Sequence, residues 1–269
     1  MRFHRYVALG DSQTEGLNDL DGHGGIRGWA DRFAAYLAET NPDLLYANLA
    51  IRGRRTVRIR ADQLEPALAL QPDLASVMAG ANDVLGRFVL EETMTDLEAM
   101  YAELRAAGAT VLGCTFPDPG ATFSIARHLT PRVRALNEAI RDAARRHGVI
   151  LVDFEAYPAV ADPRWWSRDR LHLTTAGHTR MATAFADVLG VRPDPSWQDP
   201  LPPLSPRAWW RSRVEDADWL ARYWLPWLYR HLRGLSTGDN RLAKRPELGP
   251  VFVPAAAIDK GLPEPGDRA

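Results

Sequence analysis

The most constraining feature of this chain is the alternation of short apolar runs with helix-like segments up to about residue 190. Apolar runs of strand length occupy residues 6–9, 44–49, 74–80, 110–116 and 149–154. Segments whose apolar residues recur at helical spacing occupy residues 29–39, 61–70, 93–107, 131–147 and 175–189. Apolar strands separated by helices are typical of a mainly parallel sheet that helices cover on both faces. We therefore predict an α/β protein with a mainly parallel, five-stranded sheet.

The composition changes after Gly190. Residues 191–269 hold twelve of the twenty prolines and six of the nine tryptophans, and Pro226 interrupts their longest helical stretch. We predict one domain over residues 1–190 and an irregular extension, rich in Trp, Pro and Arg, over residues 191–269. Acidic residues at 215, 216 and 218 lie among its arginines, so the charge of this segment is mixed. Packing on the domain, or on a second copy in a homo-oligomer, is therefore favoured over adsorption to an anionic membrane.

The composition also argues against several classes of protein. A net charge of −1 offers no basis for binding nucleic acid or an anionic membrane. Cys114 is the only cysteine, so a disulfide scaffold is excluded. The apolar run after the basic N-terminus is too short for a secretory signal, and no run approaches the ~20 apolar residues of a spanning helix. We expect a cytoplasmic protein with no stable membrane insertion.

Two segments carry the residues of acyl-transfer chemistry. Gly10-Asp11-Ser12 ends the first apolar run, which places a serine at the carboxyl end of a buried strand. Asp169 precedes His172 by three residues in a short polar segment, so one loop supplies both a base and the carboxylate that orients it. A serine nucleophile, a histidine base and an orienting aspartate form the triad of serine hydrolases. Ser12, Asp169 and His172 are therefore the candidate catalytic residues.

Two further segments lie between these. Gly53 follows the second predicted strand in Asn48-Leu49-Ala50-Ile51-Arg52-Gly53, and Asn82 follows the third in Gly80-Ala81-Asn82-Asp83. Together with Ser12 and His172, these segments resemble the SGNH hydrolases, also called GDSL-type esterases and lipases, over about residues 4–190. The resemblance implies a flavodoxin-like three-layer α/β/α sandwich that hydrolyses carboxylic esters. Where the family often has glycine after the aspartate, this chain has Arg170, which we expect to narrow or charge the pocket mouth.

The resemblance also implies an oxyanion hole formed by the backbone amides of Ser12 and Gly53 and the side-chain amide of Asn82. Glycine lets a backbone N–H approach a substrate closely. One donor of this kind stabilises the transition state by about 3–4 kcal/mol. Asp11 and Asn48 are interpreted as supporting residues. We expect Asp11 to shape or cap the turn at Ser12, and Asn48 to hold the loop that presents Gly53.

Other chemically suggestive residues have structural interpretations. We expect His178 to be a helix residue, Cys114 to be an inert core thiol and Asp83 to serve as a helix cap. Trp165 and Trp166 either line an acyl pocket or cover the base of the histidine loop. No His/Asp spacing typical of a metal site and no phosphate-binding glycine loop occurs in the sequence.

The sequence thus predicts a serine esterase whose small-molecule substrates are small or short-acyl carboxylic esters and which needs no metal or cofactor. A lysophospholipase, a thioesterase or a carbohydrate deacetylase would use the same residues. A non-catalytic binding protein on the same fold would not need the complete set of triad and oxyanion-hole residues, which favours an enzyme. Specificity is expected to depend on the loops at 17–28, 54–60, 84–92 and 117–130.

Overall fold

The computed structural model describes residues 2–22, 24–203, 209–233 and 236–251. Its centre is a six-stranded sheet with the strand order β5-β4-β3-β1-β2-β6. The strands are β1 (Arg5–Gly10), β2 (Leu45–Asn48), β3 (Leu74–Met78), β4 (Thr110–Cys114), β5 (Ile150–Val152) and β6 (Arg245–Pro250). Pairs among β1 to β5 are parallel, whereas β6 runs antiparallel to β2. The five predicted parallel strands are confirmed, and β6 is an additional edge strand that we did not predict.

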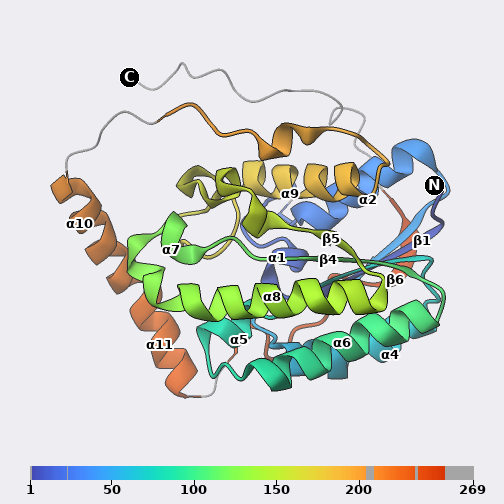
Figure 1. Cartoon of the computed structure of the whole chain (residues 1–269), viewed down its shortest axis with the longest axis horizontal. Helices are drawn as coiled ribbons and strands as arrows, with labels where there is room; N and C mark the ends of the chain where they lie inside the picture. Colours follow the sequence, from blue (N-terminus) through green and yellow to red (C-terminus); the bar gives the residue numbers. More distant parts are fainter. Residues whose placement is uncertain (1, 23, 204–208, 234–235, 252–269) are drawn as a thin grey trace.

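Helices cover both faces of the sheet, which confirms the predicted three-layer sandwich (Figure 1). One face carries α2 (Gly28–Thr40) and α9 (Thr175–Val188), which pack against each other. The other face carries α6 (Leu90–Ala106) and α8 (Thr130–His147). Beside α6 lies a continuous helical segment made of α3 (Thr56–Ile59), the π-helix η1 (Arg60–Leu64) and α4 (Glu65–Ala69).

Short helices occupy the loops at the carboxyl ends of the strands. They are α1 (Ser12–Glu15), α5 (Ala81–Leu85) and α7 (Pro119–Thr122). Short 3₁₀ helices follow at Ser124–Leu129, Phe154–Ala156, Pro158–Ala161, Pro163–Trp165 and Pro195–Gln198. Local signals mark some ends of the longer helices. The Thr174 hydroxyl accepts from Gly177 N at 3.2 Å at the start of α9, and Gly148 ends α8 with a left-handed φ of 63°.

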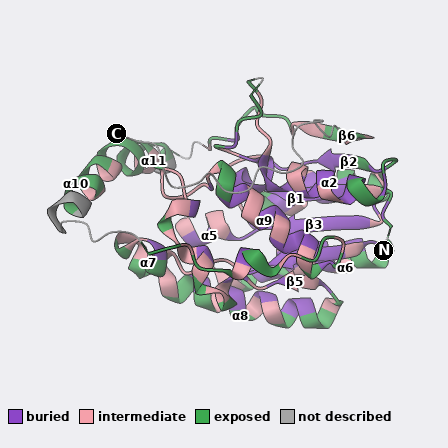
Figure 2. Cartoon of the chain, turned by 90° about the horizontal axis from the view of Figure 1, so that it is seen from above, coloured by how far each residue is buried: buried purple, intermediate pink, exposed green. Residues whose placement is uncertain are grey.

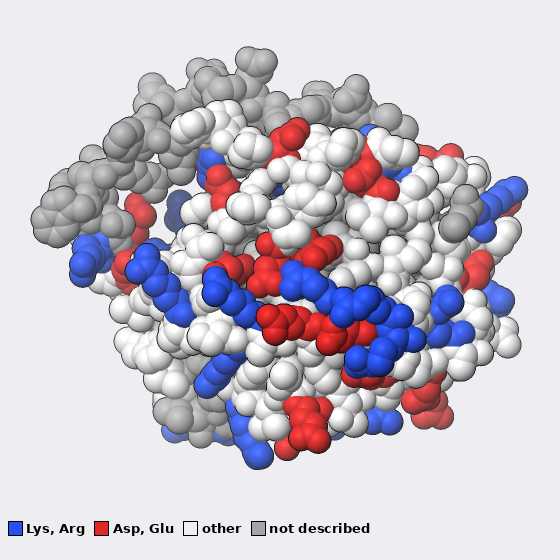
Figure 3. All heavy atoms as spheres, in the orientation of Figure 1, with Lys and Arg blue, Asp and Glu red and all other residues white. Residues whose placement is uncertain are grey.

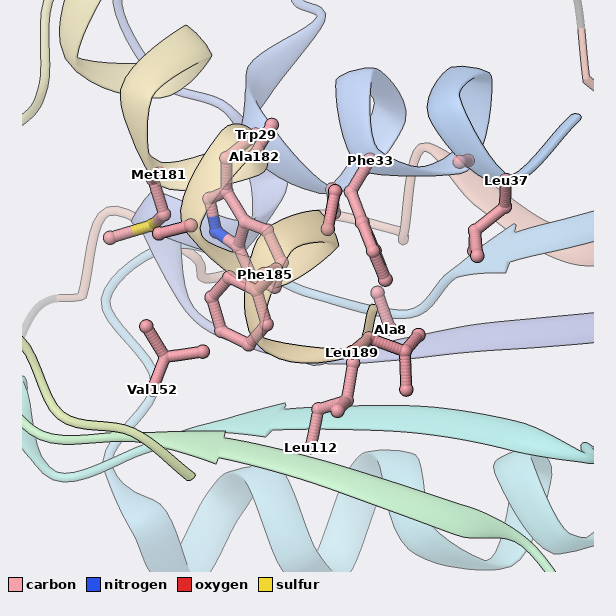
Figure 4. Packing of buried hydrophobic residues seen from close by; sticks show 14 of the residues in the cluster. Ala8, Trp29, Phe33, Leu37, Leu112, Val152, Met181, Ala182, Phe185 and Leu189 are labelled. Carbon is pink, nitrogen blue, oxygen red and sulfur yellow. The ribbon is translucent and has the colours of Figure 1, made fainter. Parts of the chain in front are cut away.

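An apolar core lies on each face of the sheet. Between the sheet and α2/α9, the rings of Trp29 and Phe185 stack with centroids 4.4 Å apart, and Phe33 lies beside them (Figure 4). On the opposite face, Leu97 of α6 and Leu136 of α8 belong to one buried cluster. Burial of each such side chain stabilises the fold by about 1.5–3 kcal/mol. The two cores hold the strand ends, and hence the loops that follow them, in fixed positions.

Where the structure describes the C-terminal extension, at residues 191–203, 209–233 and 236–251, it is more regular than predicted. Its described part contains α10 (Trp209–Trp219), the π-helix η7 (Leu220–Trp224), α11 (Leu225–Leu232) and β6. The π-helix directly precedes the turn that holds Pro226. Proline lacks the N–H that would continue the α-helical bonding pattern, and a wider π turn is one way to accommodate it. Pro226 therefore changes the local winding instead of ending the helix.

The described residues of α10 and α11 are exposed or partly buried (Figure 2), and the tryptophans of the extension differ in burial. Trp197 is 2% exposed, and its Nε1 donates to Asp187 Oδ2 at 2.8 Å. In contrast, Trp224 is 38% exposed and Tyr229 is 56% exposed. The expected packing of the tryptophans on the domain is therefore present for Trp197 and incomplete along the helix. The side chains of residues 209 and 210 lie outside the described part of the chain.

Truncation after Gly190 is expected to lower the melting temperature or the solubility. It removes β6, which leaves the edge of β2 open, and it removes Trp197 from its contacts with the rings of Phe154 and Tyr157. Loss of one buried tryptophan costs a few kcal/mol, at roughly the scale of a large apolar side chain. Thermal unfolding of the truncated chain should be compared with a variant that ends at Val251 and keeps β6. Equal melting temperatures for the two variants would refute a stabilising role.

Basic and acidic side chains lie side by side on the face that carries α8 (Figure 3). Ion pairs there join Arg141 to Asp153 at 2.7 Å and to Glu155 at 2.8 Å. This face therefore presents mixed charge, in keeping with the net charge of −1 for the whole chain. Within the ranges that the structure describes, no helix combines the length and the apolar character needed to cross a membrane.

Candidate active site

The candidate residues gather at the carboxyl ends of β1, β2 and β3. Ser12 begins α1 just after β1, and the Asp11 carboxylate caps this helix by accepting from Gln13 N at 3.2 Å. Gly53 lies in the loop beyond β2, and Asn82 lies in α5 beyond β3. Ligands of parallel α/β sheets bind at this edge. The strand topology therefore brings residues that are far apart in the sequence to one rim.

Ser12, His172 and Asp169 form a continuous chain of hydrogen bonds. His172 Nε2 lies 2.9 Å from Ser12 Oγ, and His172 Nδ1 lies 2.8 Å from Asp169 Oδ2. Because a carboxylate only accepts, Nδ1 carries the proton and Nε2 is free to accept from the serine hydroxyl. Burial acts to raise the pKa of Asp169, but the hydrogen bond and charge of His172 outweigh it and hold that pKa well below its usual value. The imidazole is thus held in the tautomer that can take a proton from Ser12.

The segment from Trp166 to Leu173, here called the His172 loop, is built largely from its own contacts. An antiparallel bridge joins its two ends, and Ser167 N donates to His172 O at 2.8 Å. Inside the loop, Asp169 Oδ1 accepts from Ser167 Oγ at 2.6 Å and from His172 N at 2.9 Å. These bonds orient the Asp169 carboxylate toward the imidazole within a compact turn.

Residues after β1 hold the His172 loop close to Ser12. Gln13 Nε2 donates to Leu171 O at 2.7 Å, and Asn18 Nδ2 donates to Asp169 Oδ2 at 2.9 Å. Neither side chain was among the residues predicted from the sequence. The available signals were the position of Gln13 beside Ser12 and the position of Asn18 in the polar loop after α1. Asn18 adopts a left-handed φ of 69°, which asparagine tolerates better than most residues.

Asn82 joins the Gly-Asp-Ser turn to the Gly53 loop. Its Nδ2 donates to Asp11 Oδ2 at 2.8 Å and to Arg54 O at 3.1 Å, so both amide hydrogens are engaged. Gly53 has a left-handed φ of 72°, a conformation that favours glycine. Burial raises the pKa of Asp11 to about 6. The amide of Asn82 can donate to a third acceptor only by exchanging one of its present hydrogen bonds.

Asn48 and Asp83 hold the loop that carries Gly53. Asn48 Nδ2 donates to Thr14 O at 2.8 Å, and its Oδ1 accepts the backbone N–H two residues later at 3.1 Å. Asp83 accepts from the backbone N of Thr56 at 2.9 Å and from its hydroxyl at 2.8 Å. Asp83 therefore satisfies the first N–H of α3, which lies earlier in the chain, instead of capping its own helix α5.

The paired tryptophans have separate positions. Trp165 is buried, and its Nε1 donates to Ala159 O at 3.2 Å. Trp166 closes the base of the His172 loop through its bridge to Leu173. The arrangement of Trp166 matches the interpretation that it covers the base of the histidine loop.

His178 and Cys114 lie in the interior. The Nδ1 atom of His178 accepts from Trp29 N at 3.2 Å, and burial lowers the pKa of this histidine to about 4. Cys114 ends β4, and burial raises the pKa of its thiol. Among the residues that the structure describes, no group of three or more His, Cys, Asp or Glu side chains is arranged to hold a metal ion.

Comparison with protein families identifies the class of enzyme. Residues 8–180 match the GDSL-like lipase/acylhydrolase family. The match spans the segments that carry Ser12, Gly53, Asn82, Asp169 and His172. The chain therefore belongs to this family and is a carboxylic ester hydrolase. A comparison with curated proteins gave no match.

Solved structures share the fold. LAE5, an α/β hydrolase enzyme from the metagenome of Lake Arreo in Spain, is 25% identical, with a TM-score of 0.60 over 70% of this chain and 95% of its own. TesA is 22% identical, with a TM-score of 0.57 over 69% of this chain and 98% of its own. A catalytic mutant of Axe2, an acetylxylan esterase from Geobacillus stearothermophilus, is 21% identical, with a TM-score of 0.58 over 70% of this chain and 94% of its own.

Proposed function

We propose that this enzyme hydrolyses small, short-acyl carboxylic esters through a triad of Ser12, His172 and Asp169. The observation that carries the proposal is the unbroken hydrogen-bond chain from Ser12 Oγ through the imidazole to the Asp169 carboxylate, at 2.9 and 2.8 Å. The catalytic mutants of Axe2 change a serine, an aspartate and a histidine, the same three residue types.

In the proposed mechanism, Ser12 Oγ attacks the ester carbonyl while His172 Nε2 takes its proton. Asp169 holds the imidazole in place and stabilises the imidazolium that forms. The tetrahedral intermediate collapses when His172 gives that proton to the leaving alkoxide, which releases an alcohol and leaves an acyl-Ser12 ester. Water, deprotonated by His172, then attacks this ester, and the carboxylic acid leaves as Ser12 is reprotonated.

We assign the oxyanion hole to the backbone N–H groups of Ser12 and Gly53 and the side-chain amide of Asn82. Ser12 N lies at the start of α1, where helix N–H groups are unpaired and favour negative charge. The left-handed Gly53 leaves its N–H unobstructed by a side chain of its own. Asn82 would contribute by exchanging its hydrogen bond to Arg54 O, the longer of its two bonds at 3.1 Å against 2.8 Å.

The preference for small acyl groups rests on the limited exposure of the reacting atoms. Ser12 is 8% exposed, and the His172 side chain is 13% exposed. An acetyl or butyryl group can reach a serine this covered with less rearrangement of its surroundings than a long alkyl chain needs. The acetyl ester substrate class of Axe2, an acetylxylan esterase, is in line with this preference.

A series of p-nitrophenyl esters from acetate to decanoate tests the substrate class, with acetylated xylose as a second kind of substrate. We expect the highest kcat/KM for the acetyl to butyryl esters and a fall with longer chains. Faster turnover of the decanoate than of the acetate would contradict the short-acyl assignment and favour a lipase.

Activity is expected to survive EDTA and to need no added metal or nucleotide. The proposed mechanism uses side chains and backbone amides for every proton transfer and for charge stabilisation. The measurement is the initial rate on p-nitrophenyl acetate before and after prolonged dialysis against EDTA. Loss of activity on chelation, restored by one divalent ion, would favour a metal-dependent mechanism.

A further inference from the structure

The C-terminal extension contacts the His172 loop through two residues of α10. Trp219, the last residue of α10, donates its indole Nε1–H to the backbone carbonyl of Asp169 at 2.7 Å. One turn earlier, Asp216 Oδ1 lies 2.5 Å from Arg170 Nη1. Trp219 and Asp216 both lie outside residues 8–180, the part of the chain that matches the family. In Figure 1, α10 and α11 run along the end of the molecule that also carries α5 and α7.

Arg170 is the centre of this contact. Its guanidinium is 5.4 Å from the ring centre of Trp219 and 5.2 Å from that of Phe123, so it lies against two aromatic rings and one carboxylate. Its backbone has a left-handed φ of 59°, which is unfavourable for a residue with a side chain. Interactions of the arginine side chain with the extension therefore stabilise a strained turn between Asp169 and His172.

The hydrogen bonds inside the His172 loop orient the Asp169 carboxylate, but they do not fix the loop relative to Ser12. That task falls to contacts with other elements. Gln13 and Asn18 hold the loop from the side of α1, and Asp216 and Trp219 hold it from the side of α10. Because the distance from His172 Nε2 to Ser12 Oγ depends on the position of the whole loop, both sides matter for proton transfer.

We infer that Trp219 and Asp216 are positioning residues for catalysis, which act by holding Asp169 and Arg170 of the His172 loop against the body of the enzyme. This inference rests on the proposed triad. It gives the C-terminal helix a role in the reaction besides a contribution to stability. A loop held from only one side would sample positions in which His172 cannot accept the Ser12 proton, and turnover would fall without a change in substrate affinity.

Trp219→Phe tests the inference, with Trp224→Phe as the matched control on the same helical segment. Phenylalanine keeps an aromatic ring at either position and removes the indole N–H, and only at Trp219 does that N–H bond to the His172 loop. Fluorophosphonate titration counts folded, reactive Ser12, so kcat is expressed per titrated site. We expect Trp219→Phe to lower this kcat about fivefold to tenfold with KM unchanged, the scale of one net hydrogen bond. The Trp224→Phe enzyme should match the wild type.

A second pair of variants covers the case in which Trp219→Phe fails to fold. Asp216→Asn removes the charge of the ion pair with Arg170, whereas Asp216→Glu keeps it. We expect Asp216→Asn to lower kcat per titrated site severalfold and Asp216→Glu to restore most of it.

The outcomes separate a positioning role from a structural one. If the variants lose melting temperature or titratable sites while kcat per site stays at the wild-type value, the extension only stabilises the fold and the inference is wrong. Equal kcat per site in Trp219→Phe and Trp224→Phe, together with wild-type kcat in Asp216→Asn, also overturns it. Absence of fluorophosphonate labelling in the wild type would instead refute the proposed triad itself.

Discussion

Ser12→Ala is expected to abolish ester hydrolysis and covalent labelling by fluorophosphonates while leaving a folded protein. The substitution removes the only atom that can form the acyl intermediate of the proposed mechanism. Removal of a triad member costs on the order of 10⁴–10⁶ in turnover. The measurement is kcat on p-nitrophenyl acetate, with thermal unfolding as the test of folding. Among the residues that the structure describes, the hydrogen-bond partner of Ser12 Oγ is His172, so a change of about 1 kcal/mol or less in stability is expected.

Ser196→Ala is the matched control for Ser12→Ala. Ser196 lies in a short 3₁₀ turn of the extension, where its backbone N–H donates to the side chain of Asp194. This variant should keep wild-type turnover and labelling. A properly folded Ser12→Ala enzyme that retains more than a few per cent of wild-type turnover would remove Ser12 from the mechanism. The nucleophile that reacts with the fluorophosphonate would then have to be another residue.

The parallel part of the fold was predictable because its central strands are buried on both faces. Tyr6 to Leu9, Leu74 to Met78 and Val111 to Cys114 are buried or nearly so, and such strands appear in the sequence as continuous apolar runs. Some of the helices between them end at a left-handed glycine, as α6 does before Gly108 and α8 before Gly148. Local composition and spacing therefore carried enough information for the order of the elements.

β6 could not be predicted in the same way. Its sequence, Arg245–Pro250, contains two prolines and a glycine, which are typical of a loop. It becomes a strand because β2 offers an open edge, and the preceding residue, Lys244, pairs with Asp31 of α2 at 2.5 Å. An edge strand held by contacts with distant residues leaves no periodic signal in its own sequence.

The candidate site likewise has one part that local spacing predicts and another that depends on distant residues. The Asp169–His172 spacing is local, so their contact could be read from the sequence. The partners that hold this pair in place come from other parts of the chain: Gln13 and Asn18 at the start, and Trp219 near the end. Their roles depend on the packing of loops and helices on the sheet. The structure is needed to find them.

Asn82→Ala is expected to lower kcat by roughly 10²–10³ while changing KM little, because an oxyanion-hole donor matters mainly in the transition state. The substitution also removes the hydrogen bonds to Asp11 Oδ2 and Arg54 O, so a loss of melting temperature is expected as well. For this reason kcat must be expressed per site titrated with a fluorophosphonate. A variant that is merely less stable would show fewer titrated sites with normal turnover at each.

Asn82→Asp provides a second test of the same donor with almost unchanged shape. Aspartate has no N–H to offer the oxyanion, and its carboxylate would face the carboxylate of Asp11, whose partner Asn82 Nδ2 now lies at 2.8 Å. Burial already raises the pKa of Asp11 to about 6, and a second carboxylate beside it would raise that pKa further. We therefore expect a loss of kcat at least as large as that of Asn82→Ala. If KM rises sharply in both variants while kcat per titrated site holds, Asn82 binds substrate in the ground state, and the oxyanion hole consists of the Ser12 and Gly53 amides alone.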